Sequence, residues 1–186
     1  MPAHLLLLVA LLALSACQSV STNSDYDPAR DFSAYRSWSW QAPAVQYAPA
    51  DPRLDSDLTT ARIRQAVAEQ LDQRGLRPAQ PGRAADLRVQ VWMLVEQRQE
   101  QFSSGYGGAW NGPWGGYWGG PAYIETRTLD YQLGTLQIDL IDGKDGQLVW
   151  RGSGERILPS GFPSPTERSA LIHETVAKVL STYPPN

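Results

Sequence analysis

The segment that most limits the fold is Ala85–Gln97, ADLRVQVWMLVEQ, in which apolar and polar side chains alternate. A period of two residues is typical of a β-strand that buries one face. The residues expected on the buried face are Leu87, Val89, Val91, Met93 and Val95. The other face carries Arg88, Gln90, Trp92, Leu94 and Glu96. The chain therefore needs a β-sheet, and a second layer to cover its apolar side.

Two segments have the helical period instead. Residues 58–74 place one apolar stripe on a helix that Ser56 or Asp57 caps and Gly75 ends. The stripe consists of Leu58, Ile63, Ala66, Val67 and Leu71. A second helix starts at the capping box of Ser164 and Glu167 and stops before Pro184. Its buried stripe consists of Ile172, Val176, Val179, Leu180 and Tyr183. A single stripe needs a single partner surface, so both helices are expected to cover the sheet.

The remaining patterns predict further strands. Residues 32–40 alternate around Trp38 and Trp40, whereas the proline-rich residues 41–57 predict no regular structure. After residue 123 the apolar face changes from odd to even positions at Gly134, which predicts a β-bulge there. The turn signal at residues 142–147 predicts a hairpin between its flanking strands. We predict an α+β fold, a mostly antiparallel sheet with two helices on one face and a long Gly/Trp-rich loop between central strands.

The first residues predict export. Residues 1–16 hold a ten-residue apolar run, Leu5–Leu14, which is too short to span a bilayer and is typical of a signal peptide. LSAC, ending at Cys17, resembles the lipobox of bacterial lipoproteins, in which the cysteine is joined to lipid. The other interpretation is a buried or disulfide-bonded cysteine. Cys17 is the only cysteine in the chain, so an intramolecular disulfide is excluded and lipidation is favoured.

The predicted anchor sets the expected location. Several acyl chains hold a protein on a membrane almost permanently. Gln18 after the cysteine resembles the sorting signal for the outer membrane, which would put the domain in the periplasm. Residues 17–30 are polar and predict a flexible tether, and residues 31–186 predict a single domain with an insertion at 103–123. A net charge of -3 argues against nucleic acid as a partner.

Several segments together resemble one bacterial lipoprotein family. They are DFSAYRSWSW, RIRQAVAEQLDQRGL, ADLRVQVW, GTLQIDLIDGKDGQLVWRG and TVAKVLSTYPPN. With them the chain resembles the family called domain of unknown function 4136, over residues 31–185. Residues 134–152 are the most specific part, and many members are similar in carrying a Gly/aromatic insertion before them. The resemblance implies an envelope lipoprotein without established activity, and it supplies no catalytic residues.

No motif predicts catalysis or a cofactor. After Cys17 the chain has one histidine, His173, which we expect on a partly exposed helix surface. Asp142 and Asp145 lack the further ligands of a calcium loop, so no metal site is predicted. Trp150 and Arg151 are residue types that recognise partners, but a core tryptophan beside an outward arginine fits the strand pattern better. We expect a protein that is not an enzyme, although a hydrolase is an open alternative.

The segment 103–123 is the candidate binding site. It contains eight glycines, whose backbone freedom opposes regular structure. Its aromatic residues are Tyr106, Trp110, Trp114, Tyr117, Trp118 and Tyr123. Aromatic rings with a polar group favour membrane interfaces, sugar faces or protein partners, so lipid headgroups, peptidoglycan or another envelope protein are expected ligands. Alternatively, the aromatic residues fold back on the apolar outer face of the sheet. A further alternative is a structural lipoprotein whose sheet edge pairs with another chain.

Overall fold

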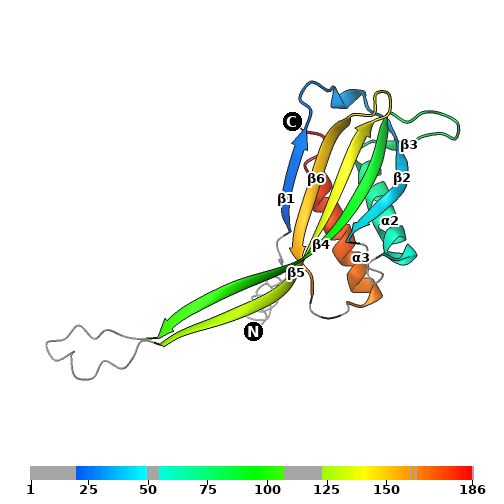
Figure 1. Cartoon of the computed structure of the whole chain (residues 1–186). Coiled ribbons are helices and arrows are strands. Elements are labelled where there is room, and N and C mark those ends of the chain that lie inside the picture. Colours follow the sequence, from blue (N-terminus) through cyan, green and yellow to red (C-terminus); the bar gives the residue numbers. More distant parts are fainter. Residues whose placement is uncertain (1–19, 50–54, 107–122, 160, 162, 186) are drawn as a thin grey trace, which may run out of the picture.

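A computed structural model describes residues 20–49, 55–106, 123–159, 161 and 163–185. Within them, one six-stranded sheet is covered on one face by two helices (Figure 1). The elements follow the chain as β1 (Ser21–Tyr26), η1 (Phe32–Ala34), β2 (Ser37–Ala48), α2 (Asp57–Gln73), β3 (Arg77–Pro78), β4 (Leu87–Tyr106), β5 (Tyr123–Asp142), β6 (Leu148–Ile157) and α3 (Pro165–Leu180). In the described part, no helix is long and apolar enough to cross a membrane.

The sheet is mixed, and the prediction of a mostly antiparallel sheet is not confirmed. Its strand order is β1-β6-β5-β4-β2-β3. β1 pairs antiparallel with β6, β6 with β5, and β5 with β4. β2 pairs parallel with both β4 and β3. The physical reason is the connection through α2, because a helix that crosses over the sheet returns the chain in the same direction. The α+β class, with both helices on one face, is confirmed.

The proline-rich segment is part of the sheet, which the sequence prediction missed. β2 continues to Ala48 and contains Pro43, and its register against β4 shifts between Trp40 and Val45. The short β3 pairs only with Ser37 and Trp38, so the rest of β2 is an edge strand. Proline is tolerated at such an edge because no neighbouring strand needs its missing N–H.

Part of the segment predicted as a flexible tether, residues 17–30, is a strand of the sheet. Residues 21–26 form β1, which pairs antiparallel with β6 from Ser21 opposite Glu155 to Tyr26 opposite Trp150. The preceding residue, Val20, is already buried. This segment is polar because it lies at the sheet edge with all its residues exposed, so composition alone did not distinguish it from a tether.

Both predicted helices are confirmed, with their caps. The Ser56 side chain accepts a hydrogen bond from the Thr59 amide at the start of α2. At the start of α3, Ser164 and Glu167 form the complete capping box, with Pro165 in the first turn. The two stripes meet the odd positions of β4 in one core, but Leu58 is 68% exposed in the first turn of α2, so its predicted place in the buried stripe is wrong. Its fully buried members include Ile63, Val67, Leu71, Leu87, Val89, Val91, Val176 and Leu180.

Two glycines let α3 approach β6. A Cβ placed on Gly154 would lie 2.7 Å from a methyl carbon of Val179, and one on Gly152 would lie 2.4 Å from the ring of Trp150. Trp150 is fully buried beneath the helices, as predicted, and Arg151 points outward. The sequence RGSG in β6 therefore serves helix–sheet packing, since any larger side chain would push the two layers apart.

The predicted bulge at Gly134 is wrong, whereas the predicted hairpin turn is confirmed. β4 and β5 keep a continuous register, in which Val95 faces Gly134. The only register shift in the pairing of β5 with β6 comes at residues 140–141. The change of apolar phase has another cause, because Leu129 lies beyond the helices and is exposed. The turn closes as Gly146 adopts a φ of 77° and donates to the Asp142 carbonyl.

Candidate functional site

The most distinctive feature of the structure is a long two-stranded ribbon. β2 last pairs with β4 at Leu94, and β6 last pairs with β5 at Leu133. Beyond these points, residues 97–106 pair only with residues 123–132, and this part is called the ribbon below. At about 3.3 Å per residue it is roughly 33 Å long. Figure 1 shows it leaving the body at one end, beyond both helices.

The two faces of the ribbon differ in chemistry. Residues that face each other across the two strands share a face. The face continuous with the helix-covered side carries mostly uncharged polar residues: Gln97, Gln99, Gln101, Ser103, Thr126, Thr128, Asp130 and Gln132. The opposite face carries Arg98, Glu100, Phe102, Glu125, Arg127, Leu129 and Tyr131. Most of the charged and apolar side chains therefore lie on one face, whereas Asp130 and Ile124, which pairs with Gly105, lie on the other.

Exposed apolar side chains are concentrated on and beside the ribbon. Seven large hydrophobic residues of the described part are exposed, and four of them lie here: Phe102, Ile124, Leu129 and Ile157. Phe102 and Leu129 share the charged face. Arg98 and Arg127 pair with Glu96 and Glu125 of their own strands, in contacts worth little in water. These pairs keep the edges polar, which limits aggregation through the open strands.

The ribbon brings two of the predicted binding residues together. Tyr106 and Tyr123 are opposite each other as its last pair, and residues 107–122 connect the two strands in the sequence. Trp110, Trp114, Tyr117 and Trp118 lie outside the described residues, as does Cys17. The backbone positions of Tyr106 and Tyr123 nevertheless set where the aromatic segment begins and ends.

The start of the domain lies at the same end of the body as the ribbon. Ser21, the first residue of β1, pairs with Glu155 near the end of β6, and two residues later Ile157 pairs with Leu133 at the ribbon base. Val20 packs beside α3, because a Cβ on Gly154 would touch both Val20 and Thr175. We call this end, marked by Val20, Leu133 and Ile157, the ribbon end.

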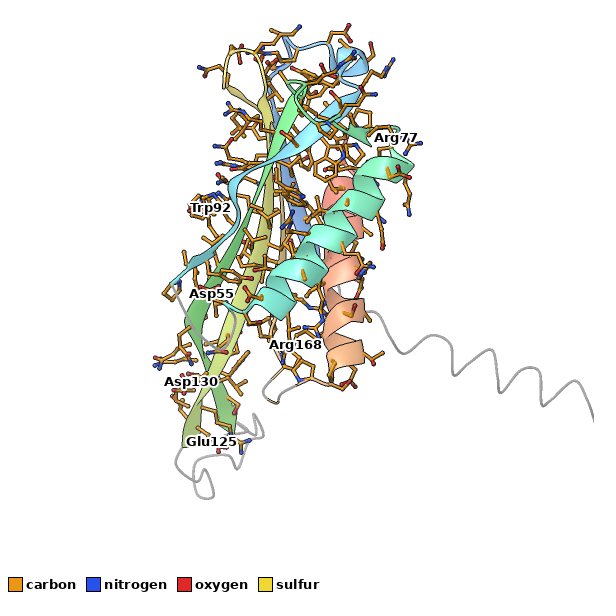
Figure 2. All side chains as sticks on the ribbon, turned by 90° about the vertical axis from the view of Figure 1, so that its right-hand side faces the viewer. Asp55, Arg77, Trp92, Glu125, Asp130 and Arg168 are labelled. Carbon is orange, nitrogen blue, oxygen red and sulfur yellow. The ribbon has the colours of Figure 1, made fainter. Side chains whose placement is uncertain are left out.

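The outer face of the sheet is half-covered. Trp92, Leu94 and Ile141 are half-buried on this face, whereas Val149 belongs to the buried core. In Figure 2, Trp92 lies on the side away from the helices. The face also carries an ion pair in which Arg151 donates through two nitrogens to Asp139, each at 2.7 Å. Arg151 is thus held across β5 and β6 by a buried carboxylate.

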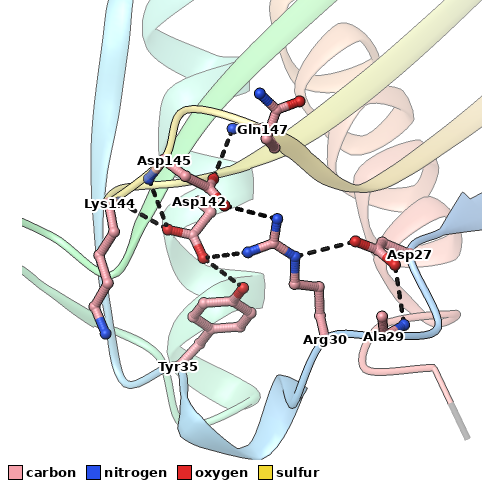
Figure 3. Close-up of polar contacts among 8 residues, drawn as sticks. All are labelled: Asp27, Ala29, Arg30, Tyr35, Asp142, Lys144, Asp145 and Gln147. Carbon is pink, nitrogen blue, oxygen red and sulfur yellow. Dashed lines mark hydrogen bonds and ion pairs between the residues drawn. The ribbon is translucent and has the colours of Figure 1, made fainter.

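The opposite end of the body, called the turn end, holds a polar cluster (Figure 3). Arg30 donates to Asp142 at 3.2 Å, to Asp145 at 2.7 Å and to Asp27 at 3.0 Å. The Tyr35 hydroxyl donates to the same Asp142 carboxylate at 2.8 Å. These bonds fasten the segment after β1 to the turn between β5 and β6.

The pKa values in this cluster follow from burial and hydrogen bonding. Burial by itself raises the pKa of Asp142, but bonds from the Lys144 amide, the Tyr35 hydroxyl and the Asp145 amide outweigh it and hold the pKa below its ordinary value. Burial, together with the bond to Asp142, raises the pKa of Tyr35 to about 12. The charged groups of the cluster bind one another, so its role is to hold two parts of the fold together.

A cavity of about 580 Å³ lies beside this cluster. It is lined by three arginines and a chain of aromatic rings in edge contact, Tyr26 with Phe32, Phe32 with Tyr35, and Phe32 with Tyr183. Arg30 is held by three carboxylates, and Arg74 donates to the carbonyls of Gln70, Leu180 and Tyr183. Arg30 and Arg74 therefore stabilise the fold through these bonds.

The described residues show no arrangement typical of an enzyme. His173 is partly exposed on α3, as predicted, with Nδ1 3.3 Å from a Glu69 oxygen on α2. Among the described residues, no three side chains of the metal-binding types lie close enough to hold an ion. Ser153 has no hydrogen-bonded base in the described part. The candidate functional site is therefore a surface, and the ribbon is the most distinctive one.

Comparison with known proteins now identifies the family. The family model described as domain of unknown function (DUF4136) matches residues 22–185. The chain belongs to this family. The DUF4136 match starts within β1, in agreement with a domain that begins before residue 31. No curated protein matches the chain.

Solved structures match the chain at low identity. A PDZ domain protein from Parabacteroides distasonis is 14% identical with a TM-score of 0.55, over 90% of this chain but only 36% of its own. A DUF4136 family protein from Bacteroides thetaiotaomicron is 18% identical with a TM-score of 0.50, over 90% of this chain and 97% of its own. The PelC dodecamer from Paraburkholderia phytofirmans is 17% identical with a TM-score of 0.46, over 88% and 95%. At these identities the first two likenesses concern the fold alone.

Proposed function

We propose that this DUF4136 protein is a lipid-anchored, non-enzymatic envelope protein that uses its ribbon to contact a component at the membrane surface. The lipobox-like LSAC and the lone Cys17 support the anchor. The ribbon supports the contact, because in the chain the glycine- and tryptophan-rich segment directly follows its last pair, Tyr106 and Tyr123. The main support for this proposal is that the start of the domain and the ribbon lie at the same end of the body.

The short connection to Cys17 limits how the domain is held. Val20 is buried in the body, and only three residue steps separate it from Cys17. An extended chain covers at most about 3.6 Å per residue, so a lipid on Cys17 lies within about 11 Å of Val20. In this proposal the body therefore rests close to the bilayer, with its ribbon end toward the membrane.

The position of the ribbon favours the membrane interface as the first contact. Tyr106 and Tyr123 mark the end of a ribbon that leaves the ribbon end of the body, where the domain also begins. Tryptophan and tyrosine are enriched where apolar lipid meets water. Charged ribbon residues such as Glu100 and Asp130 oppose insertion of its strands into hydrocarbon. We propose that the ribbon lies along the surface and that its aromatic segment enters the headgroup region.

One variant tests the contact directly. Residues 107–122 are replaced by Asn-Gly, which closes a two-residue hairpin between Tyr106 and Tyr123. Both forms carry Cys17→Ser, so that lipidation makes no contribution to binding. We expect an unchanged melting temperature but loss of co-sedimentation with phosphatidylethanolamine–phosphatidylglycerol vesicles. Equal sedimentation of the two forms would contradict membrane contact, and retained binding to peptidoglycan would redirect the proposal to glycan.

A specific observation supports assembly with another chain as a second function. Along the ribbon, the outer edges of β4 and β5 have no neighbouring strand in the described structure. Open edges can add a strand from a partner. Phe102 and Leu129 would supply apolar contacts to such a strand. Sedimentation velocity distinguishes this function, since a strict monomer without cross-linked partners in intact cells argues against it.

A further inference from the structure

A separate apolar cavity lies at the ribbon end of the body. It has a volume of about 180 Å³ and opens between the sheet and the N-terminal half of α3. Its apolar wall is formed mainly by Met93, Leu136, Leu158, Leu171 and Ile172. The cavity is independent of the aromatic segment, because every residue that lines it belongs to the body or to the base of the ribbon.

The size and wall of the cavity suit hydrocarbon. A cavity of about 150 Å³ lined by aliphatic side chains stays dry and accepts an apolar guest the size of benzene. The present cavity is slightly larger, and aliphatic residues from β4, β5 and α3 dominate its wall. Its capacity is therefore that of the end of an acyl chain rather than of a sugar or a nucleotide.

Two arginines give the cavity a positive border. Arg156 and Arg168 line it, and its lining contains no carboxylate. Arg156 is largely buried and lies 3.8 Å from a carboxylate oxygen of Glu174, outside the lining. The border thus combines an apolar interior with positive charge, of which that of Arg156 is faced by Glu174, and this matches an anionic amphiphile.

The charge of Arg168 has no counter-charge in the described structure. Its side chain forms no hydrogen bond or ion pair within the described residues, although it is half-buried. It also lies about one turn from the start of α3, where the helix dipole disfavours a cation. Figure 2 shows Arg168 at the same end of the body as the ribbon residues Asp130 and Glu125. A ligand with a negative headgroup would supply the missing counter-charge.

The beginning of the domain brings the cavity near a source of lipid. Thr175, one of the lining residues, and Val20 both approach a Cβ placed on Gly154, at 3.3 Å and 3.1 Å. Val20 follows Cys17 by three residues. Whether or not the ribbon touches the membrane, a lipid on Cys17 would hold the mouth of the cavity next to the bilayer.

We propose that this cavity binds one acyl chain of an anionic membrane phospholipid, with the phosphate placed at Arg168. This goes beyond the proposed function, since it requires neither the ribbon nor its aromatic segment and rests on that function only for the lipid anchor at Cys17. The acyl chain enters between Leu136 and α3, and the headgroup stays at the surface. Only the chain end is buried, so the protein samples lipids from the bilayer without extracting them.

The test uses the Cys17→Ser protein and lauroyl lysophosphatidylglycerol as the probe, with binding followed by native mass spectrometry and calorimetry. We expect saturable binding of one probe molecule per chain. Arg168→Gln should weaken it about tenfold, the loss of one charge-assisted contact. Arg62→Gln is the matched control, because Arg62 is a half-buried arginine of α2 outside the cavity, and its binding should be unchanged.

A second pair of variants tests the apolar part. Leu171→Trp fills the cavity and should abolish saturable binding, whereas Leu58→Trp adds the same ring at an exposed site on α2 and should not. If Leu171→Trp does not fold, the effect of Arg168→Gln on binding still tests the proposal. Absence of saturable binding, or binding that neither Arg168→Gln nor Leu171→Trp weakens, overturns the proposal. If dodecanol binds as tightly as the lysolipid, the proposed role of an anionic headgroup is wrong. If dodecanoate binds more tightly than the lysolipid, the ligand is a free fatty acid and the proposed phospholipid is wrong.

Discussion

Arg30 and Asp142, which are 112 positions apart in the sequence, form an ion pair at 3.2 Å that closes the turn end of the sheet (Figure 3). Asp142 is almost fully buried and also accepts from Tyr35 at 2.8 Å. The pair fastens the segment after β1 to the β5–β6 turn. Because β1 is an edge strand with exposed side chains, this joint supplies much of what holds it in place.

Asp142→Asn should destabilise the protein. The amide cannot accept all the bonds that the carboxylate accepts. Arg30 keeps Asp27 and Asp145, so the cost is that of hydrogen bonds lost at one buried side chain, about 1–3 kcal/mol. Urea unfolding followed by far-UV circular dichroism measures the change. Asp130→Asn is the matched control on the same strand, where the side chain is exposed, and should change the free energy of unfolding by less than about 0.5 kcal/mol.

Acid should weaken the fold through the same carboxylates. The pKa of Asp142 is lowered in the folded state, and so is that of Asp86, whose own burial is outweighed by bonds from Arg36 and Ser37. A lowered folded pKa contributes stability above the unfolded value, near 3.9, that is lost as the pH falls through the folded value. Melting temperatures measured from pH 7 to pH 2 should fall below about pH 4. In Asp142→Asn this slope should be shallower, and an identical slope would contradict the assignment.

Alkali should act on two tyrosines. Burial raises the pKa of both Tyr35 and Tyr183 to about 12. The unfolded chain ionises near pH 10 while the folded protein retains these protons, so their stability contribution is intact below pH 10 and is lost between pH 10 and 12. Absorbance titration should show these two of the eight tyrosines ionising late. Tyr183→Phe should remove one late group, and Tyr26→Phe, whose ring is exposed, serves as the control.

Gly154→Val should separate α3 from β6. The first added carbon already lies 2.7 Å from Val179, in a core without space to spare. Overpacking of this kind costs about 1–3 kcal/mol, and thermal unfolding measures it. Gly161→Val is the control, because no atom lies within 4 Å of its added Cβ. A neutral Gly154→Val would show that the helix moves freely relative to the sheet.

Cys17→Ser should release the protein from membranes. Removal of the sulfur removes the attachment point of the lipid, and any remaining contact through the ribbon is weak and reversible. Fractionation of cells followed by immunoblotting measures the distribution. Persistence of the variant in a carbonate-washed membrane fraction would contradict the lipid anchor.

The sequence alone determined the local elements. The stripes of α2 and α3 and the cap at Ser164 depend on residues within a few positions of each other, so local patterns are sufficient. The alternation at residues 87–95 likewise identified β4 and its buried face. The turn before β6 and the burial of Trp150 followed from the same local rules.

The candidate site was only partly predictable. Its position in the chain was visible, since glycine and aromatic residues mark 103–123. That β4 and β5 continue as a ribbon was missed, although the alternating residues after Glu96 were a usable signal. The cavity beside Arg168 was not visible, because β4, β5, β6 and α3 contribute its residues from distant parts of the chain.

Only the tertiary structure decided how the elements combine. The parallel pairing of β2 with β4 requires α2 to cross the sheet, and the ordering of β1 requires β6 and the Arg30–Asp142 pair. Polar sequences such as residues 21–26 carry no local sign of the strand they will join. Backbone pairing and ion pairs between distant residues are interactions that only the folded chain brings within range.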